Sequence, residues 1–118
     1  MSNSVDRSRD FYIEDMIGFC DHVLRYTDGL SLDDFVDNRL VYDATLRNLE
    51  LIGEAATHIP DETRKKYPDI PWRMIVATRN QLIHAYLGID NDTLWSIIHD
   101  DVPELVIQLR ELVNQEPV

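Results

Sequence analysis

The sequence predicts an all-α protein, a four- to five-helix bundle formed by one domain over residues 1–118. Apolar residues recur at three- and four-residue steps through most of the chain, which is the spacing of amphipathic helices. Only 4 Gly and 5 Pro are present, so turns are few and a many-stranded β fold is disfavoured. A chain of this length can bury a core without a disulfide or a metal ion.

The first helix is predicted from about Ser8 to Tyr26, before the helix-ending pair Asp28-Gly29. Ser31 is the predicted N-cap of the next helical region, because a serine hydroxyl can accept from the free backbone N–H groups of a first turn. The apolar face of the first helix comprises Ile13, Met16 or Ile17, Cys20, Val23 and Leu24.

A second helical region is predicted over residues 32–58, with an interruption near Asp37-Asn38. The small residues Gly53, Ala55 and Ala56 would let another helix approach closely. Ile59-Pro60 ends this region, and Asp61 is expected to cap a short helix that runs through Lys66.

A third helix is predicted to begin at Pro71 or Trp72, because proline suits the first helical position. It should turn Met74, Ile75, Leu82 and Ile83 inward and end near residues 86–88. A last helix should start near Thr93 after the cap residues Asp90-Asn91-Asp92. Pro103 should kink or split that helix.

The charge of −11 argues at first sight against a nucleic-acid partner. However, residues 47–84 carry six basic and five acidic side chains, whereas the segments on both sides are strongly acidic. A local positive cleft is compatible with this distribution, and so is an acidic surface that only maintains solubility. One cysteine, no secretory signal and no apolar run of about 20 residues lead us to expect a cytoplasmic protein without a membrane segment.

The most informative segment is Arg79-Asn80-Gln81-Leu82-Ile83-His84-Ala85-Tyr86. Asn80 and His84 are four residues apart and share one helix face. Arg79 should lie about 140° around the helix from His84 and ~7.5 Å along its axis. One chain is therefore poorly arranged to hold one small group with both side chains, and a second copy related by a two-fold axis could bring them together. We expect a homodimer.

These residue types fit RNA cleavage without a metal ion. His84 can move a proton near neutral pH, Arg79 can stabilise the charge on a phosphate, and Asn80 can orient either group. No carboxylate cluster for a two-metal nuclease is evident. The alternative interpretation is an ordinary helix in which Arg79 pairs with an acidic neighbour and His84 has a structural role.

The Arg-x-x-x-x-His pattern resembles the signature of HEPN ribonucleases, and the fuller sequence is similar to the HepT family. Four further stretches carry that resemblance: Ile70-Pro71-Trp72-Arg73, Gly88-Ile89-Asp90, residues 47–55 and residues 101–105. The resemblance implies a metal-independent endoribonuclease toxin of a type VII-like toxin–antitoxin pair, with Arg79, Asn80 and His84 as catalytic residues.

The same resemblance implies that an MntA-type minimal nucleotidyltransferase is the partner and antitoxin. It would transfer AMP to Tyr86, placing negative charge and bulk beside the cleft. ATP and Mg²⁺ would serve the partner's reaction, so no cofactor or metal ion is expected in this chain.

Several other residues leave two interpretations open. Arg47, Asn48, Glu50 and Glu54 could line the cleft or form a structural network that orients the motif helix. Arg64, Lys65 and Lys66 could contact RNA, although a solvated helix end is favoured. Structural roles are favoured over metal binding for His22, His58 and His99.

Two alternative functions also stay open. One is a non-catalytic subunit that binds a nucleotide or the nucleotidyltransferase, and the other is a helical dimer in which the motif only organises the interface.

Overall fold

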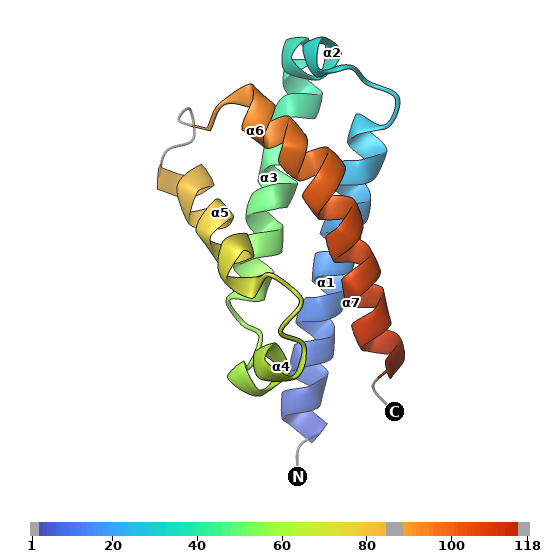
Figure 1. Cartoon of the computed structure of the whole chain (residues 1–118), viewed down its shortest axis with the longest axis vertical. Helices are drawn as coiled ribbons and strands as arrows, with labels where there is room; N and C mark the ends of the chain where they lie inside the picture. The colour runs from blue at the N-terminus through green and yellow to red at the C-terminus, as the bar shows by residue number, and fades with distance from the viewer. Residues whose placement is uncertain (1–2, 85–88, 116–118) are drawn as a thin grey trace.

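The computed structural model describes residues 3–84 and 89–115, and side chains from residue 8 onward. These residues form helices and no strand, in an elongated body of 50 × 28 × 22 Å. The helix α3 packs against α1 on one side and α5 on the other, and α7 packs against α1 (Figure 1). The elements are α1 Asn3–Thr27, α2 Leu32–Asp37, α3 Arg39–Ala56, α4 Asp61–Lys66, α5 Trp72–His84, α6 Asn91–Ser96, the π-helical turn η1 Ile97–Asp101 and α7 Val102–Gln115. The predicted all-α bundle is confirmed.

The first two helix boundaries follow the predicted local signals. Gly29 ends α1 with a φ of 75°, a backbone conformation that glycine adopts without a steric penalty. The Ser31 hydroxyl accepts from the backbone N–H of Asp34 and caps α2. Asn38 interrupts the second helical region as expected, and its side chain caps α3 through the N–H of Val41. The start of α1 was predicted too late, because no breaker residue separates Asn3 from Ser8.

The short helix α4 corrects one prediction. Its N-cap position is Pro60, no side chain caps it, and Asp61 is already its first helical residue. Arg64 does not point to solvent. Its Nη2 and Nε donate to the backbone carbonyls of Ala56 and Ile59 at 2.6 and 3.2 Å, so this side chain binds the chain at the end of α3 and just after it.

The last helical region is split ahead of Pro103, as predicted. Proline has no N–H to donate within a helix. The chain forms the π-helical turn η1 just before it, and the N–H of Val102 donates to the carbonyl of Ile97. Asp90 caps α6 by accepting from the N–H of Thr93 at 2.8 Å, a bond that holds the pKa of the Asp90 carboxyl below its usual value.

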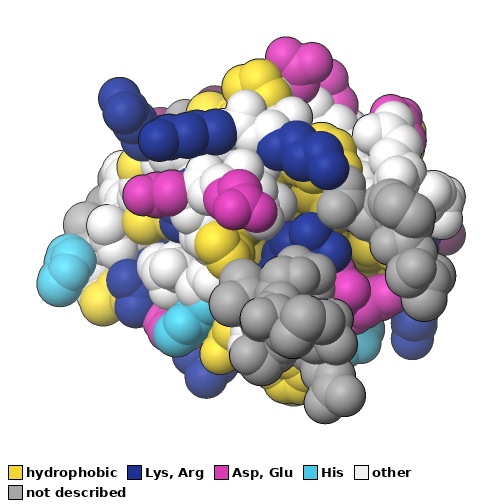
Figure 2. Space-filling view, turned by 90° about the horizontal axis from the view of Figure 1, so that it is seen from below, with side chains coloured by type: hydrophobic (Ala, Val, Ile, Leu, Met, Phe, Trp, Pro, Cys, Tyr) yellow, Lys and Arg dark blue, Asp and Glu magenta, His cyan; other side chains and the backbone are white. Residues whose placement is uncertain are grey.

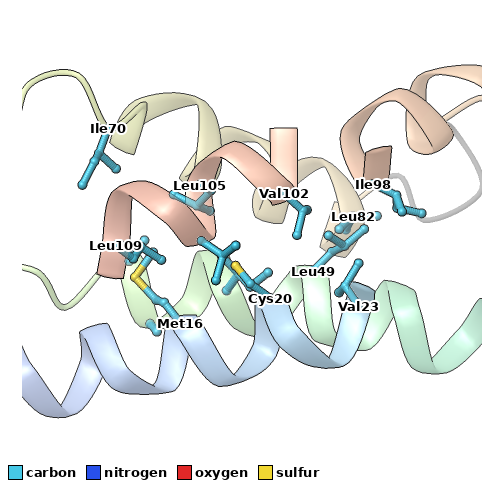
Figure 3. Close-up of a cluster of buried hydrophobic side chains, with 14 of the residues drawn as sticks. Met16, Cys20, Val23, Leu49, Ile70, Leu82, Ile98, Val102, Leu105 and Leu109 are labelled. Atoms are coloured by element: carbon cyan, nitrogen blue, oxygen red, sulfur yellow. The ribbon is translucent and has the colours of Figure 1, made fainter. Parts of the chain in front are cut away.

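The core gathers side chains from every long helix. Figure 3 shows Met16, Cys20 and Val23 of α1 turned toward residues of α3, α5, η1 and α7, namely Leu49, Leu82, Ile98, Val102, Leu105 and Leu109. The predicted apolar face of α1 is therefore confirmed. Burial, together with the neighbouring Asp21, raises the pKa of the Cys20 thiol to about 12, so this cysteine stays protonated and unreactive.

The inward face of α5 was only partly predicted. Leu82 is buried and Ile75 is half-buried, but Met74 and Ile83 are 49% and 43% exposed. The helix faces α3 with the ridge of Ile75, Arg79 and Leu82, which places Met74 and Ile83 on its two flanks. The predicted end of this helix lies outside the described residues. No described helix is long and apolar enough to cross a membrane.

Candidate functional site

The helix α5 carries the candidate site and is fixed firmly at its first turn. Trp72 is buried, and its indole Nε1 donates to the carbonyl of Tyr67 at 3.0 Å. Pro71 precedes the helix and its carbonyl accepts from the N–H of Ile75. The orientation of α5 is thus set by its start and by Leu82 near its end, and this orientation determines where the polar residues between them point.

Arg79 lies directly against a glycine of α3. A Cβ atom added to Gly53 would lie 2.1 Å from Arg79 Cβ and 3.1 Å from the backbone oxygen of Ile75. Only a residue without a side chain allows this approach. Gly53 therefore lets α5 come close to α3, and the base of the Arg79 side chain occupies the space that a Cβ atom would fill.

The guanidinium group of Arg79 is held by two protein acceptors. Nη2 donates to Glu54 Oε1 at 2.6 Å, and Nη1 donates to Asn80 Oδ1 at 2.9 Å. Nε is buried and has no acceptor among the described residues. The Arg79 side chain is only 25% exposed, so its orientation is well defined. Because arginine has five N–H donors, the two Nη groups keep further donors for an anion.

Asn80 and His84 occupy a different side of the helix, and both are exposed. Their four-residue spacing places them on one ridge, as predicted. Within one chain, no described contact joins His84 to Arg79, which agrees with their predicted angular separation. Tyr86 lies outside the described residues.

The four candidate residues of α3 divide into two groups. Arg47 and Glu50 form an ion pair and line a small pocket together with Leu82 of α5, and Glu54 binds Arg79. These three residues therefore border the contact between α3 and α5. Asn48 is buried on another side of α3.

Asn48 belongs to the contact between α1 and α3. Its Oδ1 lies 3.0 Å from Nδ1 of His22, and its Nδ2 donates to the carbonyl of Ala44. For Asn48 the structure favours the structural interpretation over cleft lining.

Sequence reasoning did not connect His58 and Tyr12 to the site. The His58 ring stacks on Tyr12 with ring centroids 4.5 Å apart, and its Nε2 lies 3.7 Å from Glu54 Oε2. A row of contacts thus runs from Tyr12 through His58 and Glu54 to Arg79. The four-residue spacing of Glu54 and His58 was a usable signal. No sequence signal predicted the contact between His58 and Tyr12, because the two residues are far apart in the chain. No group of three or more metal-binding side chains occurs in the described residues.

A helical bundle with an arginine, an amide and an imidazole on one helix is consistent with a protein of the HEPN type. The comparison with known families gives the more specific assignment. The family described as "Ribonuclease HepT-like" matches residues 16–112, which include α3, α5 and every site residue predicted from the sequence. The chain belongs to the HepT-like ribonuclease family.

Individual relatives agree with this assignment. "Putative RNase TTE0752" of Caldanaerobacter subterraneus subsp. tengcongensis is 35% identical over 105 residues, covering 89% of this chain and 94% of the relative. "Probable ribonuclease HepT" of Thermococcus cleftensis is 36% identical over 99 residues, covering 84% and 90%. "Putative RNase MJ1380" of Methanocaldococcus jannaschii is 37% identical over 94 residues, covering 80% and 86%. No solved structure matches the chain.

Proposed function

We propose that the protein is a metal-independent endoribonuclease whose active site forms between two copies of the chain. The observation that carries this proposal is the division of the motif on α5: Arg79 is held against α3, whereas His84 faces solvent on another side of the same helix. Membership of a ribonuclease family supplies the reaction class. In a dimer, Arg79 of one copy would work together with His84 of the other copy.

The exposed apolar side chains of α5 support an association through this helix. Met74 and Ile83 flank the face that carries Asn80 and His84, and about half of each side chain is exposed. Because each side chain is already about half buried, covering the rest against a second copy is favourable by about half of the roughly 1.5–3 kcal/mol that full burial gives. A two-fold axis near the end of α5 would cover Ile83 and place Arg79 of one copy near His84 of the other.

The chemistry then needs only the residues of the motif. His84 of one copy removes the proton from a ribose 2′-hydroxyl, whose oxygen attacks the adjacent phosphate. The protonated His84 then returns this proton, through a water molecule, to the leaving 5′-oxygen. Arg79 stabilises the charge that develops on the phosphate, using the Nη donors that Glu54 and Asn80 leave unused. The products are a cyclic phosphate and a free 5′-hydroxyl.

The same proposal assigns the protein to the toxin half of a type VII-like toxin–antitoxin pair in the cytoplasm. An MntA-type nucleotidyltransferase silences it by transferring AMP from ATP to the Tyr86 hydroxyl, and pyrophosphate leaves. Mg²⁺ acts in the partner's active site. Tyr86 follows His84 by two residues, so each AMP places a phosphate charge and a nucleoside beside the imidazole.

The decisive experiment is RNA cleavage by the purified chain, free of its partner, with EDTA present. Wild type should cut, and His84→Ala should not. The matched control is His99→Ala, because His99 is also exposed and its side chain makes a ring contact with Trp95 but no hydrogen bond or ion pair with a described residue. Full activity in His84→Ala would refute the catalytic assignment. No cleavage by wild type, together with tight binding of the nucleotidyltransferase, would favour the non-catalytic binding subunit.

A mixing experiment tests whether the site is shared between copies. Arg79→Ala and His84→Ala should each be inactive alone. After the two proteins are unfolded together and refolded, mixed dimers contain one intact Arg79–His84 combination, so part of the activity should return. If no activity returns although mixed dimers are detected by mass spectrometry, each chain must carry a complete site.

A further inference from the structure

A groove between α4 and α5 lies beside the candidate site and carries an unusual charge for this protein. Its lining comes from α4, the loop of residues 68–71 and the first turns of α5. The charged side chains in the lining are Asp61, Arg64, Lys65 and Arg73. The groove is therefore net positive in a chain whose total charge is −11. Figure 2 views the end of the molecule where α4 lies and shows Lys and Arg side chains alternating with acidic ones.

Two of these cations differ from most others in the structure because they lack a carboxylate partner. Arg64 is occupied by the carbonyl groups at the end of α3. Lys65 and Arg73 are exposed and make no ion pair or hydrogen bond with a described residue. By contrast, described ion pairs join Arg9 to Asp10, Arg39 to Asp43, Arg47 to Glu50, Arg79 to Glu54 and Arg110 to Asp21. An exposed cation without a partner can bind a phosphate without first breaking an ion pair.

The groove is continuous with the exposed face of α5 that carries His84. One ridge of α5 consists of four exposed residues at steps of four, three and four, which are Arg73, Ala77, Asn80 and His84. Arg73 and His84 are eleven residues apart, about 16 Å along a helix axis. That length accommodates up to about five stacked nucleotides at 3.4 Å each.

We propose that this groove binds the sugar-phosphate backbone of the RNA strand that flanks the cleaved bond, with Lys65 and Arg73 contacting phosphates. The proposal rests on the function proposed above for the site. Trp72 cannot serve as a stacking platform, because it is buried and its indole N–H is bonded to Tyr67. The groove therefore contributes affinity without base selectivity.

The test measures binding of a 15-nucleotide single-stranded RNA to the His84→Ala protein over a range of salt concentrations. Arg73→Ala should reduce the slope of log affinity against log salt by about 0.7, and Lys65→Ala/Arg73→Ala by about 1.4. The matched control is Arg25→Ala. Arg25 is also exposed and makes no ion pair or hydrogen bond with a described residue, but it lies in the last turn of α1, at the other end of the bundle from α4 (Figure 1). It should leave the slope unchanged.

The outcomes separate the groove from the enzymatic function. If the slope falls equally in Arg73→Ala and Arg25→Ala, only net charge matters and the groove proposal is wrong. If RNA affinity is unchanged but the double variant no longer binds the nucleotidyltransferase, the groove is a protein-binding surface and the proposal is also wrong. If the slope falls as expected but the wild-type protein does not cut RNA, the groove proposal stands and the ribonuclease function is wrong. In an active protein, the double variant should raise KM and keep kcat.

Discussion

The two largest helix contacts of α3, with α1 and with α5, differ in kind. Against α1 it packs with buried apolar side chains, and its polar pair Asn48–His22 is satisfied within the contact. Against α5 it presents Gly53, and the group that fills the space is the base of a charged side chain, Arg79. The first contact supplies stability and tolerates similar residues. The second contact sets the position of one guanidinium group, so it tolerates few substitutions.

The first prediction tests the apolar core that α1 shares with α3 and α7, and it has the largest expected effect on stability. Leu109 is 0% exposed, so Leu109→Ala should lower the free energy of unfolding by about 2–5 kcal/mol through lost burial and a residual cavity. Leu40→Ala is the control, because Leu40 is 81% exposed and should change stability by less than about 0.5 kcal/mol. Urea unfolding measures both. A cost below about 1 kcal/mol for Leu109→Ala would mean that α7 is not part of the core.

The second prediction tests the contact between α3 and α5. In Gly53→Ala the new Cβ would overlap Arg79, so α5 must shift, at a cost of about 1–3 kcal/mol. Because Arg79 moves with the helix, kcat for RNA cleavage should fall by about 10²-fold. Gly18→Ala is the matched control, since nothing lies within 4 Å of its Cβ position and alanine favours a helix. It should keep full activity and gain up to about 1 kcal/mol. Unchanged kcat in folded Gly53→Ala would show that the position of Arg79 is not critical.

The third prediction separates the charge of the site from its packing. Glu54→Gln keeps the size of the side chain but removes the charge that holds Arg79 Nη2. Because both side chains are partly exposed, stability should fall by less than about 1 kcal/mol. Arg79 Nη2 then has only an uncharged acceptor at position 54, so the guanidinium is held less firmly, and kcat should fall several-fold while KM does not rise. Asp43→Asn is the control. It removes the same charge from α3 but affects the ion pair with Arg39. Equal kcat in both variants would assign Glu54 no positioning role.

The sequence predicted the core side of this comparison well and the site side only in part. Helix caps such as Ser31 and Asn38, and the break before Pro103, depend on neighbours within a few residues, so local patterns were sufficient. The angular separation of Arg79 and His84 followed from helix geometry alone. The exposure of Met74 and Ile83 could not be predicted, because it depends on which ridge of α5 meets α3.

The same limit applies to the pairs within the site. Glu54 was a candidate by its spacing in α3, yet its contact with Arg79 joins residues 25 positions apart. Asn48 and Glu54 looked equivalent on the sequence, although one faces α1 and the other α5. Such assignments need the relative rotation of two packed helices, which composition and periodicity do not contain. Gly53 indicates in the sequence that another helix comes close, but the sequence does not show which residue of that helix makes the contact.

The smallest predicted effect concerns Asp101 in η1. Partial burial raises the pKa of its carboxyl, and the nearby Asp100 and Glu104 raise it further. The folded state therefore binds this proton more tightly than the unfolded state does, so ionisation of Asp101 disfavours folding at neutral pH. Asp101→Asn should raise Tm slightly at pH 7, and the gain should shrink as the pH is lowered toward about 4. The control is Glu111→Gln, an exposed acidic residue outside this cluster. If Asp101→Asn raises Tm equally at both pH values, removal of the charge is not the cause. The amide must then stabilise the fold through a contact of its own.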